Sequence, residues 1–177
     1  MVNIRDIKSD ENNWFTYGIF DSTSLFHEEM KVMIFTDDGA SLEDAYRCIE
    51  HYNSLTDQSD LYTQIENMLK PFFLYMYEEW GAMEDVYEEI ADSLEPVIEG
   101  FKKGEALCSY LYSPTLLVFP QLEGELGYGV EAECPWEPEH MCCILIRNEK
   151  VVYVGPSEGN DPWQDEEDYY CIWNEED

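Results

Sequence analysis

The stretch LYTQIENMLKPFFLYMYEEW, residues 61–80, decides the fold class of this chain. Its apolar side chains recur every three or four positions, at Leu61, Ile65, Met68, Leu69, Phe72, Phe73, Met76 and Trp80. This spacing predicts a long amphipathic helix that buries a wide apolar stripe. Pro71 lies inside the stretch, and because proline removes a backbone hydrogen bond, we expect a kink or a split near Lys70.

Two further helices are predicted on either side of this one. Ser41 followed by Asp44 is typical of a helix N-terminus, and this helix is expected to run to about Tyr52. After the central helix, a second apolar pattern predicts a helix with an interruption at Pro96 and a C-terminal stop at Gly104. That pattern consists of Val86, Ile90, Leu94, Val97, Ile98 and Phe101.

Extended segments flank the helices. Trp14 to Phe20 and Met30 to Phe35 predict two strands near the N-terminus. After the helices, extended segments are expected at 107–112, 115–119, 124–134, 141–147 and 151–154. Strands followed by helices and then strands predict an α+β fold in a single domain, 1–177. Its parts are an N-terminal β-hairpin (about 14–35), central helices (about 41–103), a C-terminal antiparallel sheet (about 107–155) and an acidic aromatic tail (161–177).

The charge of the chain is its most unusual property. Among 177 residues, 9 Lys and Arg stand against 40 Asp and Glu, so the formal net charge is −31. Direct binding to nucleic acid or to an anionic membrane is excluded, because both require a basic surface. Apolar residues make up 45% of the chain and aromatic residues 15%, which distinguishes it from a disordered acidic tail.

The sequence also bears on the cellular compartment. Met1 to Asn13 lacks the apolar core of a secretory signal, and no apolar stretch reaches the ~20 residues of a membrane span. We therefore expect a cytoplasmic protein. Reduced, buried thiols are predicted for its six cysteines, and disulfides or a metal site are the alternatives. The cysteines are Cys48, Cys108, Cys134, Cys142, Cys143 and Cys171.

The run CPWEPEHMCC, residues 134–143, is the most distinctive local element. Cys134, His140 and either Cys142 or Cys143 are residue types that zinc favours, and a Cys–His pair is also needed for a thiol nucleophile. In a strand, however, Cys142 and Cys143 point to opposite faces and cannot serve one metal. Since the spacing of a zinc site is incomplete, we predict a structural turn, with no metal ligand, catalytic residue or cofactor.

From about Leu116 to Gly155 the chain resembles the C-terminal part of uncharacterised acidic bacterial domains. These domains have an extended segment, a Cys-x-Trp-x-x-Glu-His-Gly-like turn and a hairpin that ends in Val-Gly. The matching residues are Cys134, Trp136, Glu139, His140, Val154 and Gly155, and Met141 replaces the glycine. Such domains are similar in size and charge to immunity factors found beside bacterial toxins, and the resemblance implies no catalytic residues.

Nine acidic residues and no basic one lie from Glu78 to Glu99. On a helix, like-charged pairs four residues apart, such as Glu84 with Glu88, each destabilise by about 0.2–0.5 kcal/mol. A well-hydrated surface is one explanation, and a surface that binds a basic partner is the other. The predicted partner-binding residues are Glu78, Glu79, Glu84, Asp85, Glu88, Glu89, Asp92 and Glu95. Candidate apolar anchors are Tyr75, Tyr77, Trp80, Tyr87, Trp163, Tyr169, Tyr170 and Trp173, although Trp80 is expected in the core.

We therefore predict a non-enzymatic acidic protein that inhibits a basic protein partner. That partner is expected to be a toxin, a nuclease or another nucleic-acid-binding protein, blocked by an immunity protein or by a nucleic-acid mimic. Two alternatives stay open. One is a calcium-binding protein that uses the tail 161–177, which does not match the known calcium loop. The other is a zinc- or thiol-dependent enzyme built on Cys134, His140 and Cys142.

Overall fold

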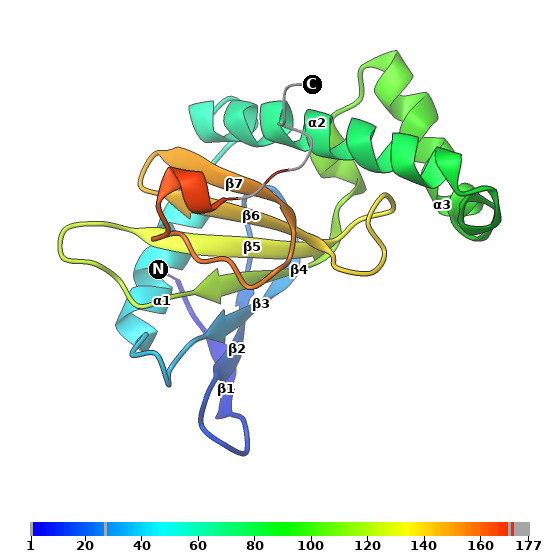
Figure 1. Ribbon diagram of the computed structural model, residues 1–177. Helices are drawn as coiled ribbons and strands as arrows, with labels where there is room; N and C mark the ends of the chain where they lie inside the picture. The colour runs from blue at the N-terminus through cyan, green and yellow to red at the C-terminus, as the bar shows by residue number, and fades with distance from the viewer. Residues whose placement is uncertain (1, 27, 170, 172–177) are drawn as a thin grey trace.

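The computed structural model describes residues 2–26, 28–169 and 171, and these form one mixed β-sheet with helices packed on it (Figure 1). Its strands are β1 (Arg5–Ser9), β2 (Thr16–Asp21), β3 (Glu29–Ile34), β4 (Tyr112–Val118), β5 (Gly127–Glu133), β6 (Cys142–Arg147) and β7 (Lys150–Pro156). Its helices are α1 (Leu42–Ser54), α2 (Asp60–Ala82) and α3 (Glu84–Lys103), with short 3₁₀-helices η1 (Leu107–Tyr110) and η2 (Glu166–Asp168). The fold is therefore α+β, as predicted.

The seven strands lie in the sheet in the order of the chain. Neighbouring strands are antiparallel, except for the parallel pair β3 and β4. A parallel pair requires a long crossover, and the helices between the two strands supply it. The predicted N-terminal hairpin, β2 with β3, is thereby continuous with the C-terminal strands. The sequence analysis did not predict β1 or the parallel pair.

Helices α1 and α2 pack on the sheet, with the main hydrophobic core between them and the strands, whereas α3 packs on α2 and η1 (Figure 1). In β3 the buried side chains of Met30, Val32 and Ile34 alternate with the exposed Lys31 and the half-buried Met33. A smaller cluster lies on the opposite face, together with part of the segment after β7: Leu117, Phe119, Cys143, Leu145, Tyr153 and Cys171. No helix within the described residues is long and apolar enough to cross a membrane.

The ends of the helices agree with the sequence, whereas the effect predicted for the prolines does not. Ser41 and Asp44 form a capping box at the start of α1, and Gly104 ends α3 in the left-handed conformation with φ 86°. Of the kink or split expected near Lys70, the split is wrong, and so is the interruption expected at Pro96, because both prolines lie inside continuous helices. Buried side chains before and after each proline hold both parts against the core, which offsets the lost hydrogen bond.

The strand predicted from Leu107 to Tyr112 is wrong over its first four residues, which form η1. The backbone N–H groups of Leu107 and Cys108 donate to the carboxylate of Glu66 in α2, over 3.0 and 2.8 Å. This carboxylate satisfies amides that a short helix leaves free at its start. The contact joins residues about forty positions apart, so local patterns did not reveal it.

Trp136, in the turn between β5 and β6, fixes the position of α2. Its side chain is 0% exposed and meets the rings of Phe72 and Phe73 edge-on, with centroid distances of 6.4 and 5.6 Å. The indole Nε1 of Trp80 donates to the Trp136 carbonyl over 2.7 Å. The second half of α2 is therefore held by both packing and a hydrogen bond.

Gln64 attaches the first half of α2 to β7, the last strand of the sheet. Its Oε1 accepts from the backbone N–H of Val151 over 2.9 Å, and its Nε2 donates to the carbonyl of Glu149 over 3.2 Å. Strand edges expose unpaired backbone groups, and here the helix satisfies one such group in β7 and one carbonyl in the turn before it.

We expect Gln64→Ala to lower the free energy of unfolding by about 1–3 kcal/mol, because the N–H of the buried Val151 loses its acceptor. Asn67→Ala is the matched control, since Asn67 is exposed on the same helix. Chemical denaturation followed by circular dichroism measures both changes. Equal stabilities of the two variants would contradict this role of Gln64.

Candidate functional site

The end of α2 and the first half of α3 form an acidic helical hairpin, which we define as residues 78–95. Only Met83 separates the two helices, with φ −107° and ψ 83°. Its N–H donates to the Trp80 carbonyl over 3.0 Å, and its carbonyl accepts from the Tyr87 N–H over 2.9 Å. The chain thus ends one helix and begins the next without a flexible loop.

The predicted acidic residues lie together on this hairpin. Seven of them are exposed: Glu78, Glu79, Asp85, Glu88, Glu89, Asp92 and Glu95. None of the seven side chains makes an ion pair or hydrogen bond with another residue of the described segments. Glu84 is the first residue of α3, and its side chain lies outside the description. The nearest ion pair along α3 joins Lys103 to Glu99, beyond the hairpin.

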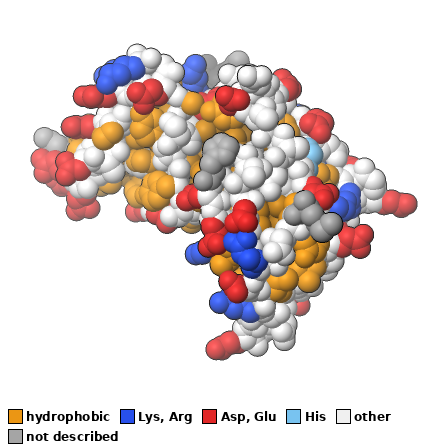
Figure 2. All heavy atoms as spheres, turned by 180° about the vertical axis from the view of Figure 1, so that it is seen from behind, with side chains coloured by type: hydrophobic (Ala, Val, Ile, Leu, Met, Phe, Trp, Pro, Cys, Tyr) orange, Lys and Arg blue, Asp and Glu red, His pale blue; other side chains and the backbone are white. Residues whose placement is uncertain are grey.

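The hairpin is anchored to the core at its Leu94 end, whereas the α2–α3 connection at Met83 lies away from the sheet. In α3 the buried apolar side chains are Leu94, Val97 and Ile98, all at the end of the hairpin or after it. The α2–α3 connection lies at one extreme of the molecule, on the right in Figure 1. Carboxylates gather at the same end in the view from behind, on the left of Figure 2. The repulsion among these carboxylates is therefore screened only by water and dissolved ions.

Most of the aromatic residues predicted as anchors have structural contacts instead. Trp80 is half-buried, as expected, and donates to Trp136. Tyr75, Tyr77 and Tyr87 pack against the main core. In the tail, the Trp163 indole donates to the Pro120 carbonyl over 2.8 Å and the Tyr169 hydroxyl to the Asp161 carbonyl over 2.9 Å. Tyr170 and Trp173 lie outside the described residues.

Exposed apolar surface at the hairpin comes instead from two residues that the sequence analysis did not select. Met83, at the turn, is 46% exposed, and Leu74, one turn of α2 before the hairpin, is 41% exposed. Methionine adapts its shape to irregular partners. The position of Met83 between two acidic helices was the signal that would have identified it.

The turn from Cys134 to Cys143 has the geometry of a structural turn. Glu137 is 5% exposed, and its Oε1 accepts from the N–H groups of Glu139 and His140, over 3.1 Å each. Cys142 belongs to the main core and Cys143 to the smaller cluster, so they point to opposite faces, as predicted. Among the residues described, no group of three or more His, Cys, Asp or Glu is arranged to hold a metal ion.

The six thiols are free and buried. Burial raises the pKa of Cys134 to about 12 and that of Cys171 to about 11, and it also raises the pKa of Cys142 well above its ordinary value. A nucleophilic cysteine requires the opposite, a lowered pKa near a positive charge. This environment favours structural thiols over the thiol-dependent alternative.

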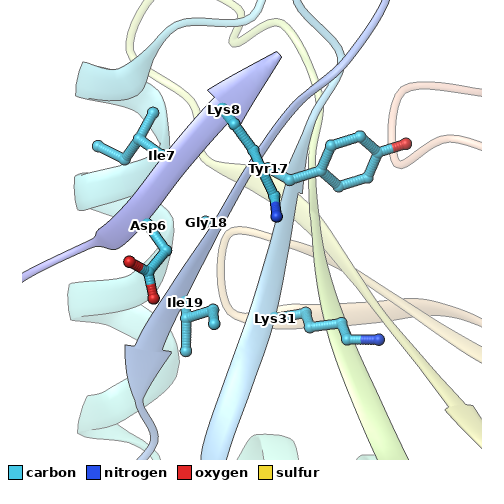
Figure 3. A pocket seen from close by; sticks show the side chains of 7 residues that line it. All are labelled: Asp6, Ile7, Lys8, Tyr17, Gly18, Ile19 and Lys31. Atoms are coloured by element: carbon cyan, nitrogen blue, oxygen red, sulfur yellow. The ribbon is translucent and has the colours of Figure 1, made fainter. Parts of the chain in front are cut away.

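A cavity of about 590 Å³ lies on the open face of β1 to β3 (Figure 3). Lys8 and Lys31 line it beside Tyr17, and neither lysine makes an ion pair within the described part of the chain. The register brings them together, because Lys8 pairs with Tyr17 and Lys31 with Ile19. Such proximity depends on strand pairing, which is why the sequence analysis missed it. This face is the least suitable one for a basic partner.

The fold and the site define a class of protein, an α+β domain that carries an acidic helical hairpin. The chain belongs to the family described as a domain of unknown function (DUF6985), whose model matches residues 3–162. The match includes the acidic hairpin and the turn from Cys134 to Cys143. No curated protein and no solved structure matches the chain.

We expect the native protein to react slowly with a thiol reagent such as DTNB at about pH 8, because burial keeps its cysteines protonated. Cys171 should react first, since its pKa of about 11 lies below those of Cys134 and Cys48, both about 12. Denatured protein serves as the control, and all six of its thiols should react with the reagent in a single rapid phase. A rapid reaction of Cys134 in the native state would contradict its assignment as a structural residue.

Proposed function

We propose that this protein is a non-enzymatic binding protein whose acidic hairpin binds and blocks a basic protein that handles nucleic acid. The observation that supports it is the row of seven exposed carboxylates without cationic partners in the described residues. A bacterial toxin neutralised by this chain as its immunity protein is the proposed setting. A defence nuclease blocked by a mimic of its nucleic acid is the closest variant of it.

The arrangement of the carboxylates on the hairpin has an energetic cost. Asp85 with Glu89 and Glu88 with Asp92 are like-charged pairs one turn apart in α3. Each destabilises the helix by about 0.2–0.5 kcal/mol at low salt. The chain has nine basic residues, and none of them lies on the hairpin to relieve the repulsion. A basic partner would supply the missing positive charges, and the relief of this repulsion would contribute to the free energy of binding.

The spacing of the carboxylates suits a surface that normally binds phosphates. Helix positions three and four residues apart are separated by about 5–6 Å, close to the spacing of phosphates along one strand of nucleic acid. Charges of this density also raise the association rate with a basic partner, and added salt lowers that rate. Met83 and Leu74 offer apolar contacts beside these charges, and burial of such residues is what gives an interface its affinity.

The proposal places this binding in the cytoplasm, where the six thiols remain reduced. It involves no cofactor. It also involves no direct contact with nucleic acid or with a membrane, since these would require a basic surface or an anchor.

The triple variant Glu88→Lys, Glu89→Lys and Asp92→Lys should weaken binding to the basic partner at least tenfold and flatten its salt dependence. The partner is first isolated by affinity capture from the host lysate at low salt and released at ~0.5 M salt. Isothermal titration with the purified partner then gives Kd at several salt concentrations.

The matched control carries Glu11→Lys, Asp57→Lys and Glu123→Lys, three exposed acids outside the hairpin with no side-chain partner among the described residues. Both triple variants change the net charge equally, so only the position of the charge differs. The control should keep most of the wild-type affinity. If both variants lose affinity equally, the net charge and not the hairpin is responsible, and the assigned surface is wrong.

A further inference from the structure

A second cavity, of about 340 Å³, lies where the parallel strands β3 and β4 end. Phe35 follows β3 and Phe119 follows β4, and the N–H of Phe35 donates to the carbonyl of Val118 over 3.0 Å. The remaining wall comes from the segment after β7. The cavity is lined by Phe35, Asp38, Phe119, Pro120, Gly159, Asp161 and Trp163. In Figure 1 the ends of β3 and β4 point away from the acidic hairpin.

Three aromatic rings line this cavity. Phe35 and Phe119 stack with a centroid distance of 4.7 Å and an interplanar angle of 12°. Phe15 supports Phe35 from the side, edge-on at 5.3 Å. The pair is therefore fixed before any ligand arrives, which lowers the entropic cost of binding.

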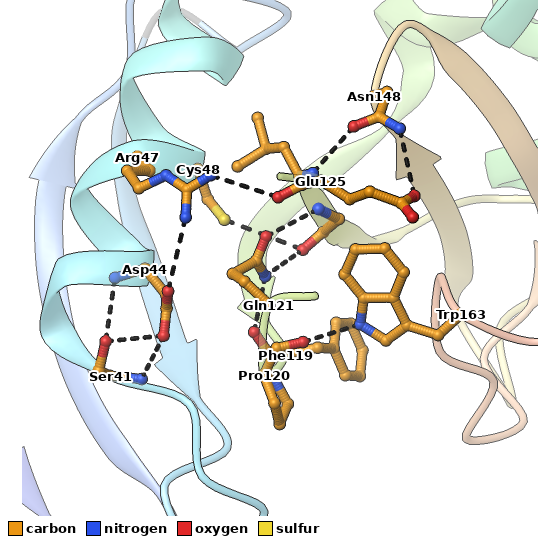
Figure 4. Close-up of polar contacts among 12 residues, drawn as sticks. Ser41, Asp44, Arg47, Cys48, Phe119, Pro120, Gln121, Glu125, Asn148 and Trp163 are labelled. Atoms are coloured by element: carbon orange, nitrogen blue, oxygen red, sulfur yellow. Dashed lines mark hydrogen bonds and ion pairs between the residues drawn. The ribbon is translucent and has the colours of Figure 1, made fainter. Parts of the chain in front are cut away.

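Trp163 is held by its own set of contacts (Figure 4). Its indole Nε1 donates to the Pro120 carbonyl over 2.8 Å, and its backbone N–H donates to Asp161 Oδ1 over 2.7 Å. Gly127 leaves room for the ring, because a Cβ there would approach the ring to 2.6 Å. Gln121 braces the same region by donating to the carbonyls of Phe119 and Gly127, over 2.7 Å each.

The charges at this cavity are negative only. Asp38 is exposed, and its carboxylate has no partner among the described residues. Asp161 is half-buried and directs one carboxylate oxygen to the Trp163 N–H. Among the described residues, no Lys or Arg lines the cavity. Aromatic faces and carboxylates both attract cations, whereas an anion would meet repulsion from both.

We propose that this cavity binds the guanidinium group of an arginine side chain presented by a polypeptide. A guanidinium is planar and weakly hydrated, so it stacks on aromatic rings and donates hydrogen bonds to a carboxylate in the same pose. A metal ion would need several oxygen, nitrogen or sulfur ligands around it, and Asp38 and Asp161 do not belong to any group of three or more His, Cys, Asp or Glu among the described residues that could hold one. This site is separate from the acidic hairpin and does not depend on the function proposed for it.

The test is a titration of ¹⁵N-labelled protein with N-acetyl-arginine-amide at ~0.15 M salt, followed by amide chemical shifts. Saturable shifts are expected at Asp38, Gly159 and Trp163. The neutral isostere N-acetyl-citrulline-amide should leave these amides unchanged. Free arginine should bind no more tightly than the capped form, because both carry a net charge of +1 and the attraction of its α-ammonium group to a chain of net charge −31 is offset by the repulsion of its α-carboxylate.

Asp38→Asn should weaken binding of the capped arginine by about 2- to 5-fold, the effect typical of an exposed ion pair. Asp37→Asn is the matched control, since Asp37 is exposed, adjacent in sequence and not part of the lining. Trp163→Leu should weaken binding further than Asp38→Asn does. The amide chemical-shift dispersion of the Trp163→Leu variant reports whether that variant is folded.

Three outcomes would overturn the assignment: no saturable shift, equal shifts with citrulline, or equal effects of Asp37→Asn and Asp38→Asn. Tighter binding of free arginine than of the capped form would instead show that the guanidinium group does not come from a polypeptide. Chemical-shift changes confined to the acidic hairpin would show that arginine binds wherever negative charge is densest. This result would refute the arginine site at the cavity and leave the proposal for the hairpin intact.

Discussion

The burial of Trp136 beneath α2 is the constraint on which the rest of the structure depends. Its ring fills the space between Phe72, Phe73 and the sheet, and its carbonyl accepts from Trp80. Removing so large a side chain from a closed core costs about 3–5 kcal/mol in typical proteins. The contact holds the second half of α2 against the sheet and so sets where the acidic hairpin begins.

The hairpin stays uncompensated because none of the nine Lys and Arg residues lies within residues 78–95. Arg5 pairs with Asp21 and Glu29 at the first edge of the sheet, and Lys150 pairs with Glu166 near the last. Exposed pairs of this kind contribute little to stability. Lys8 and Lys31, which have no ion pair among the described residues, lie on the open face of β1 to β3 and not near residues 78–95. The two proposed sites are both suited to positive charge and lie on different elements, the hairpin between α2 and α3 and the cavity at the ends of β3 and β4.

The helices, their caps and the exposure of the acidic residues were predictable, because each depends on spacing within one helix. The strand β1 was not, since its residues are mostly exposed and show no apolar alternation. The parallel pairing of β3 with β4 joins segments about eighty residues apart. The arginine-binding cavity was equally hidden, because Phe35, Phe119 and Trp163 meet only after that pairing and after the tail has packed on the sheet.

Hydrogen–deuterium exchange of the protein, alone and saturated with the basic partner proposed for it, tests the central claim most directly, because exchange reports which backbone amides the partner protects. The account predicts slower exchange over residues 78–95, most of all around Met83, and little change in β1 to β3. Protection confined to the open face of β1 to β3, with unchanged exchange over 78–95, would contradict it.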